Sequence, residues 1–183
     1  MDLKQTLEKM LSANRFFNSK TTDGADGRNP FENDYSRIVL SSYVRRMQDK
    51  AQVFPLAQND FVRTRLTHSL EVSCFAKGLG LGVETFMLNR GLLDDRQRGF
   101  IPSIAETAGL VHDIGNPPFG HFGEESIRVF FRKLKTDATS KTGAAYQTLP
   151  PERQADFENF DGNVQGFRIL KSLAPNRHGD SFN

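Results

Sequence analysis

The chain has 183 residues, 37% of them hydrophobic, which is enough for one domain with a buried core. Its formal net charge of +2 is too small to indicate nucleic-acid binding by itself. The single cysteine, Cys74, excludes an intrachain disulfide and favours a reducing compartment. No apolar run reaches the ~18 residues of a membrane span, and residues 1–10 lack the apolar core of a secretory signal, so we expect a soluble cytoplasmic protein with no membrane partner.

The N-terminal part is predicted to contain a short helix, a polar loop and a longer helix. The leucines and methionine of residues 2–12 have amphipathic spacing, whereas residues 18–30 are polar and glycine-rich, which is typical of a mobile loop outside the domain. We therefore divide the chain into residues 1–30 and 31–183. Asp34 is expected to cap the next helix, whose apolar positions predict a buried stripe: Ile38, Val39, Tyr43, Val44 and Met47.

His68 begins the next predicted helix. Together with Val72, Phe75 and Leu79 it follows the spacing of one helical face, so we expect His68 to point inward along an apolar stripe. An inward-facing histidine needs a polar partner. A metal ion is one such partner, and a backbone carbonyl or a carboxylate is the structural alternative.

Residues 90–100 form a charged connector, after which Ser103 and Glu106 predict a capping box for a helix that ends in His112 and Asp113. A glycine and two prolines follow directly, so the backbone can turn and let both side chains reach one ion. Mixed imidazole and carboxylate ligands suit Mn, Fe, Co, Ni or Zn, and the lack of thiolates argues against a closed structural zinc site. The alternative is a capping aspartate beside a core histidine.

His121 and Glu124 lie three residues apart and so share one face if this stretch is helical. The positive end of the helix dipole favours neutral imidazole, whereas the carboxylate favours the charged form. The structural alternative is a surface pair that contributes little to stability. Beyond this pair, residues 126–135 predict a helix, residues 136–150 a loop or disordered insertion, and the stretch that starts at residue 157 opens a last helix.

These residues together resemble the HD-domain metal-dependent phosphohydrolases, in which one histidine precedes a His-Asp pair. The surrounding sequence is more specific and is similar to the deoxyguanosinetriphosphate triphosphohydrolase (dGTPase) branch of that family. The resemblance covers about residues 31–173 and rests on four blocks: Gln52-Val53-Phe54-Pro55, residues 63–69 (RTRLTHS), residues 112–124 (HDIGNPPFGHFGE) and residues 160–168 (FDGNVQGFR).

The resemblance implies an all-α, HD-domain helical bundle and a role for each matching residue. A divalent metal ion, Mn2+ or Mg2+, is implied for His68, His112 and Asp113. His121 matches a catalytic histidine that is oriented by Glu124. The matching positions that contact substrate are Gln52 at the sugar, Arg65 near the phosphates, and Asn163. The family carries glutamate where this chain has Asp161.

The family closes its metal site with a fourth ligand, an aspartate on a later helix that this chain does not reach. We therefore expect an N-terminal part of a larger enzyme, incomplete at the C-terminus and marginally stable. The complete enzyme would hydrolyse a deoxynucleoside triphosphate to deoxynucleoside and triphosphate, as a homo-oligomer. Three alternatives remain: another HD activity such as a nucleotidase or cyclic-nucleotide phosphodiesterase, an inert fragment, or a single-stranded nucleic-acid-binding module that uses Arg45, Arg46, Arg63 and Arg65.

Overall fold

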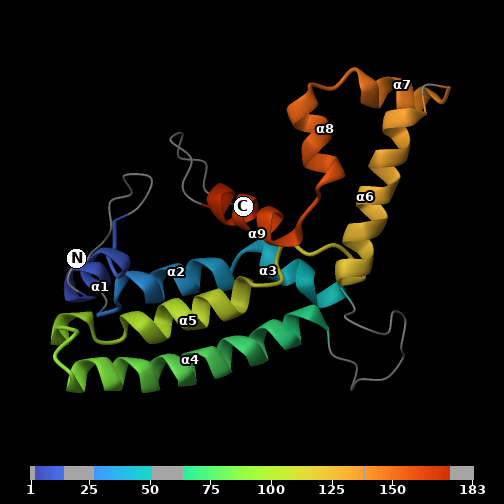
Figure 1. Cartoon of the computed structure of the whole chain (residues 1–183). Helices are drawn as coiled ribbons and strands as arrows, with labels where there is room; N and C mark the ends of the chain where they lie inside the picture. Colours follow the sequence, from blue (N-terminus) through green and yellow to red (C-terminus); the bar gives the residue numbers. More distant parts are fainter. Residues whose placement is uncertain (1–2, 15–26, 51–63, 138, 174–183) are drawn as a thin grey trace.

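The computed structural model describes residues 3–14, 27–50, 64–137 and 139–173, and these form helices without any strand (Figure 1). The all-α prediction is therefore confirmed for this part of the chain. Its α-helices are α1 (Leu3–Met10), α2 (Pro30–Val39), α3 (Ser42–Arg45), α4 (Arg65–Asn89), α5 (Phe100–Val111), α6 (Gly120–Thr136), α7 (Lys141–Gln147), α8 (Pro151–Glu158) and α9 (Gly162–Leu173). Two short 3-10 helices, η1 (Arg46–Asp49) and η2 (Asp95–Gln97), complete the set.

The long helix α4 and the helix α5 lie side by side and run in opposite directions, with α2 packed on α5 (Figure 1). Glycines let the two backbones approach closely. A Cβ atom on Gly80 would lie 2.9 Å from Cα of Pro102, and one on Gly109 would lie 2.8 Å from Cα of Ser73. The antiparallel arrangement brings the start of α4 next to the end of α5.

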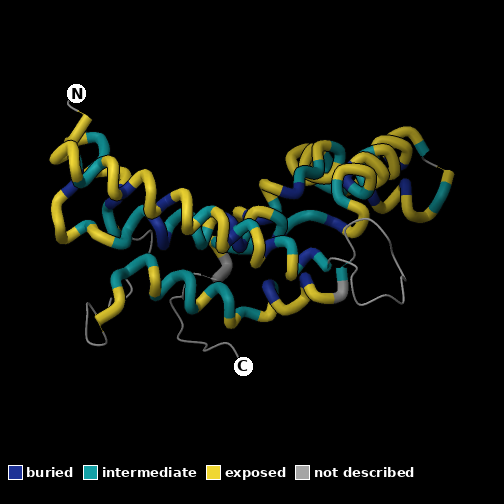
Figure 2. Tube along the Cα trace, turned by 90° about the horizontal axis from the view of Figure 1, so that it is seen from below, coloured by how far each residue is buried: buried dark blue, intermediate teal, exposed yellow. Residues whose placement is uncertain are grey.

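The prediction of an inward apolar stripe on α4 is wrong for Phe75 and Leu79, which are 76% and 74% exposed. The residues of α4 that are buried are instead small or polar: Arg65, Ser69, Ser73, Gly80 and Glu84. Of these, Ser73 and Gly80 lie against α5. The reason is the short distance between the helices, which admits a serine or a glycine but no aromatic ring. Figure 2 shows how few of the described positions are buried.

The hydrophobic core lies under the end of α5, where Val44, Met47, Leu110 and Ile114 are buried together. The stripe predicted after Asp34 contributes Val44 and Met47 to this cluster, while its other members pack against it and are partly buried. The core thus fixes the segment from which His112 and Asp113 project.

Two predicted helix starts are wrong. Asp34 lies inside α2, because Asn29 caps this helix: its side chain accepts the Phe31 and Glu32 N–H groups, and Glu32 accepts the N–H of Asn29 at 2.7 Å. Ser103 likewise lies inside α5, which starts after Gly99. Gly99 adopts φ of +86°, a conformation that favours glycine.

Helices α6, α7 and α8 project from the rest of the chain as an arm (Figure 1). The loop predicted for residues 136–150 is wrong over α7, where Ser140 caps the helix by accepting the N–H of Gly143. The arm has its own aromatic cluster, in which the rings of Phe131 and Phe157 stack with centroids 4.4 Å apart beside buried Tyr146. This packing stabilises α7, a helix that the polar composition of residues 136–150 does not predict.

The division into residues 1–30 and 31–183 stays a prediction, since most of the proposed mobile loop lies outside the described residues. Within the described part of the chain, no helix combines the length and the apolar character that crossing a membrane requires.

Candidate metal and catalytic site

Three potential metal ligands meet where α4 begins and α5 ends. His68 lies in the first turn of α4, and His112 and Asp113 directly follow α5. One ligand atom from each residue lies within 4.8 Å of the other two, so the group could hold a metal ion. Residues that are far apart in sequence are thus brought together by the antiparallel helix pair.

The donor set and its orientation fit a divalent metal. The ring of His112 donates from Nδ1 to the carbonyl of Gly109 at 2.8 Å, which leaves Nε2 free as a ligand atom. This Nε2 lies 3.7 Å from Oδ1 of Asp113. Two imidazole nitrogens and one carboxylate are ligands that Mn2+, Fe2+ or Zn2+ accepts readily.

The carboxylate of Asp113 is held by the turn that follows it. The side-chain amide of Asn116 donates to Oδ1 at 2.6 Å, and Nε of Arg65 lies 3.9 Å from Oδ2. Arg65 also donates from a terminal nitrogen to the backbone carbonyl of Asn116 at 2.6 Å. The aspartate is therefore fixed from two sides.

Arg65 is only 2% exposed, so its charge lies within the protein. Its Nε is the one buried side-chain nitrogen or oxygen without a hydrogen-bond partner in the described part of the chain. Lys50 reaches the same Asn116 carbonyl at 3.5 Å. Burial, followed by repulsion from Arg65 and Arg46, lowers the pKa of Lys50. The turn thus carries an excess of positive charge beside the ligand cluster.

The His121–Glu124 pair occupies the first turn of α6. Phe119 precedes this helix with φ of +67°, an unusual conformation for a residue with a side chain. Nδ1 of His121 lies 3.0 Å from Oε2 of Glu124, and the imidazole is 93% exposed whereas the carboxylate is 8% exposed. A buried carboxylate therefore orients a histidine whose ring is accessible to solvent.

Glu124 also receives the N–H of Gly162, at the start of α9, on Oε1 at 2.7 Å. Burial raises the pKa of Glu124 and is the largest single influence. The hydrogen bonds from His121 and Gly162, together with the charges of His121 and Arg128, outweigh it and lower this pKa. The acid is thus held in its ionised form.

The other predicted site residues are less enclosed or lie outside the described residues. Asn163 is exposed at the start of α9, where Asp161 accepts its N–H at 2.8 Å and so caps the helix despite the shorter side chain. Gln52 lies outside the described residues, as does Arg63. The burial of Arg65 removes it from any surface that could hold nucleic acid.

Sequence reasoning missed two residues of the site, Asn116 and Gly162. Asn116 stands three residues after Asp113, a spacing that suits a side-chain contact in a turn. No sequence spacing marks Gly162 in the same way, because the residues that it contacts, Asn116 and Glu124, come from other segments of the chain.

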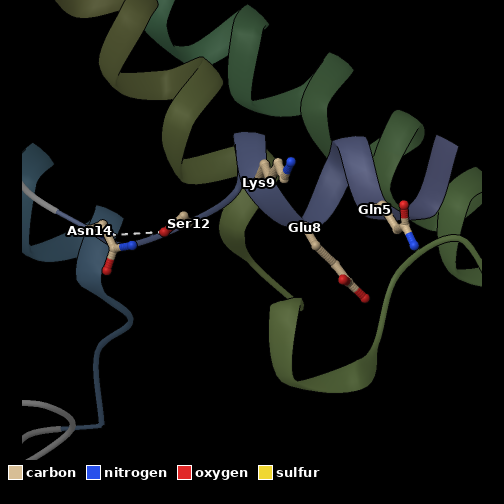
Figure 3. A pocket seen from close by; sticks show the side chains of 5 residues that line it. All are labelled: Gln5, Glu8, Lys9, Ser12 and Asn14. Atoms are coloured by element: carbon tan, nitrogen blue, oxygen red, sulfur yellow. Dashed lines mark hydrogen bonds between the residues drawn. The ribbon is translucent and has the colours of Figure 1, made fainter. Parts of the chain in front are cut away.

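The described chain also has an open pocket of ≈ 570 Å³ on and after α1, at the far end of the α4–α5 pair from the ligand cluster (Figures 1 and 3). Figure 3 shows that Glu8 and Lys9 point in different directions, and that Asn14 donates its N–H to Ser12 at 3.2 Å. This pocket gathers no ligand set or acid–base pair.

Residues 65–152 match the model of the HD domain family, so this segment of the chain belongs to that family. The segment includes the three clustered ligands and the His121–Glu124 pair. The chain is also similar to deoxyguanosinetriphosphate triphosphohydrolase-like proteins: it is 47% identical over 171 residues to one from Listeria monocytogenes and 43% identical over 173 residues to one from Synechocystis.

These alignments cover 91% and 94% of this chain but 37% and 38% of the two relatives. A deoxyguanosinetriphosphate triphosphohydrolase from Cronobacter sakazakii is 40% identical over 165 residues, which cover 78% of this chain and 33% of the relative. The chain thus spans 33–38% of the length of these relatives.

Proposed function

We propose that this chain supplies the metal and proton-transfer residues of a hydrolase that cleaves a deoxynucleoside triphosphate to deoxynucleoside and inorganic triphosphate. The observation that carries the proposal is the convergence of His68, His112 and Asp113 within 4.8 Å. The names of the relatives favour dGTP as the first substrate to test.

His68, His112 and Asp113 would hold a divalent ion, with Mn2+ or Mg2+ as the candidates. Mn2+ suits the two imidazoles better, because Mg2+ prefers oxygen ligands. A divalent ion bound there polarises phosphoryl oxygens and acidifies water. The protein orients the ligands: the carbonyl of Gly109 accepts a hydrogen bond from His112, and the side-chain amide of Asn116 donates one to Asp113.

His121 is the proposed general acid–base. Its Nδ1 faces the ionised Glu124, so Nε2 on the exposed side of the ring can exchange a proton with water or with the departing deoxynucleoside oxygen. Glu124 sets the direction of the ring through its contact with Nδ1.

Three further residues are proposed for substrate binding. Arg65 would offset phosphate charge from within the turn through the positive charge of its buried guanidinium, which lies beside Asp113. Asn163 is exposed and would contact the nucleoside, and Gln52 is assigned to the sugar from the resemblance alone.

Assembly and location complete the proposal. The uncovered aromatic side chains on α4 support a homo-oligomeric complete protein, since exposed apolar surface is characteristic of interaction sites. The lone Cys74 supports a cytoplasmic location.

Product analysis tests this function. The 183-residue chain, and in parallel a chain extended toward the relatives' length, is incubated with dGTP and Mn2+, and the products are separated by ion exchange. We expect the extended chain to release deoxyguanosine and triphosphate in equal amounts, and the 183-residue chain shows whether the three clustered ligands suffice for turnover. Both products should disappear in His112→Ala and His121→Ala and persist in the control Cys74→Ser, an exposed position. Pyrophosphate or single phosphate as the product would refute the reaction.

A further inference from the structure

The ligand cluster and the His121–Glu124 pair are joined through one backbone position. Asn116 donates to Asp113 on the ligand side, and Glu124 holds His121 on the other side. Both Asn116 and Glu124 contact Gly162, the first residue of α9. A continuous path of contacts therefore connects the two groups of reactive side chains.

Gly162 lies where an added side chain would displace two polar groups. A Cβ atom at this position would overlap Oδ1 of Asn116 and lie 2.8 Å from Oε1 of Glu124, so both side chains would have to shift. The N–H of the same residue donates to that Glu124 oxygen at 2.7 Å. Gly162 thus contacts the acid and the amide at once.

The orientation of the Asn116 amide depends on this contact. Its backbone carbonyl is fixed by Arg65 and Lys50, so the side chain can move only by rotating about its own bonds. The amide nitrogen points at Asp113 while the amide oxygen lies against Gly162. Any displacement of the oxygen therefore withdraws the nitrogen from the aspartate.

We propose that Gly162 and Asn116 are positioning residues that hold the metal-ligand cluster and the His121–Glu124 pair in fixed relation to each other. The inference rests on the proposed metal site. Residues that orient a metal ligand contribute about 10- to 100-fold to metal affinity in comparable sites. Gly162 acts through Asn116 at the metal and through Glu124 at the histidine.

Metal affinity provides the first test. Mn2+ is titrated calorimetrically into the 183-residue chain and into three variants. Asn116→Ala keeps the backbone carbonyl that Arg65 needs, and we expect it to weaken Mn2+ binding about 10- to 100-fold. Gly162→Ala should weaken binding by a similar factor although it touches no ligand. The matched control is Gly166→Ala on the same helix, whose Cβ would meet Ile114 at 3.4 Å, an ordinary contact; its affinity should not change.

Ring NMR signals of the histidines, recorded without metal, provide the second test. Gly162→Ala should shift the signals of His121 and also those of His112, whereas Gly166→Ala should shift neither. A Gly162→Ala chain with wild-type Mn2+ affinity, or with changes at His121 alone, overturns the inference. If Gly162→Ala does not fold, wild-type affinity in Asn116→Ala overturns it equally.

The experiments distinguish failure of the proposed metal site from failure of the proposed positioning role of Gly162 and Asn116. A wild-type chain that binds no Mn2+ refutes the metal site, and the positioning role is then judged by whether the His121 and His112 signals move together in Gly162→Ala.

Discussion

The imidazole rings of His68 and His112 lie 5.3 Å apart, centroid to centroid, with their planes inclined by 70°. One ring comes from the first turn of α4 and the other from the end of α5. The packing of serines and glycines between these helices sets that distance. The ligand atoms are therefore arranged by the fold itself, before any ion contributes binding energy.

Removal of either histidine should abolish metal binding. His68→Ala and His112→Ala each remove one of the three clustered ligand atoms. Mn2+ at 100 times its dissociation constant should stabilise the wild-type chain by about 2.7 kcal/mol, and we expect no such stabilisation in the variants. Thermal unfolding with and without Mn2+ measures this effect, and Cys74→Ser is the control. Equal stabilisation of His112→Ala and wild type would show that the ion binds elsewhere.

Loss of the buried guanidinium should destabilise the chain. Arg65→Ala removes the guanidinium that lies 3.9 Å from Asp113 and takes a donor from the Asn116 carbonyl. We expect a decrease of about 3 kcal/mol in the free energy of unfolding, which urea titration measures. Arg45→Ala, at an exposed position in α3, should change it by less than about 0.5 kcal/mol. Similar values for the two variants would mean that the Arg65 contacts contribute no net stability.

Acid should weaken the fold through Glu124. Its pKa is lowered in the folded chain, so the ionised carboxylate stabilises the fold above the ordinary glutamate pKa of about 4.3. This contribution is lost as the pH falls through the lowered value. Urea midpoints recorded from about pH 6 to about pH 3 should fall less steeply in Glu124→Gln than in wild type. Glu152→Gln, an exposed position in α8, should follow the wild-type curve, and identical curves for all three chains would contradict the assignment.

Glycine-to-alanine substitutions in α4 should have opposite signs. Gly80→Ala places a Cβ 2.9 Å from Cα of Pro102 and should destabilise the chain by about 1–3 kcal/mol. Gly82→Ala meets no described atom within 4 Å and should stabilise the helix by about 0.5–1 kcal/mol. Urea titration of both variants provides the measurement. Stabilisation by both would show that α5 does not pack where the structure places it.

The sequence predicted which three potential ligands come together better than it predicted the packing of the helices. The spacing and chemistry of His68, His112 and Asp113 suggested a shared ion, and the structure brings them together. The same spacing argument placed Phe75 on the buried face and was wrong, because periodicity shows which residues share a face but not which face a neighbouring helix covers.

The remaining differences have one local and one tertiary cause. Asp34 has the chemistry of a capping residue, but Asn29 and Glu32 form a complete capping box, with Pro30 between them, and start the helix earlier. This box is a local pattern that the sequence does carry. Helix α7 has little intrinsic helical character and depends on Tyr146, whose hydroxyl donates to the carbonyl of Gln154 in α8 at 3.0 Å. That contact with the next helix cannot be derived from the sequence of α7 alone.

Helix α4 buries small and polar residues and exposes large apolar ones, and this changes how natural variation in the helix should be interpreted. Ser73 and Gly80 face α5, and Ser73 donates to the carbonyl of Glu106 at 2.8 Å, whereas Phe75 and Leu79 are exposed. Hydrophobicity therefore does not indicate which positions of the isolated chain resist replacement. A substitution that looks conservative, such as serine to valine on the α5 side, would disturb the fold, while a charged residue in place of an outward aromatic would leave it intact.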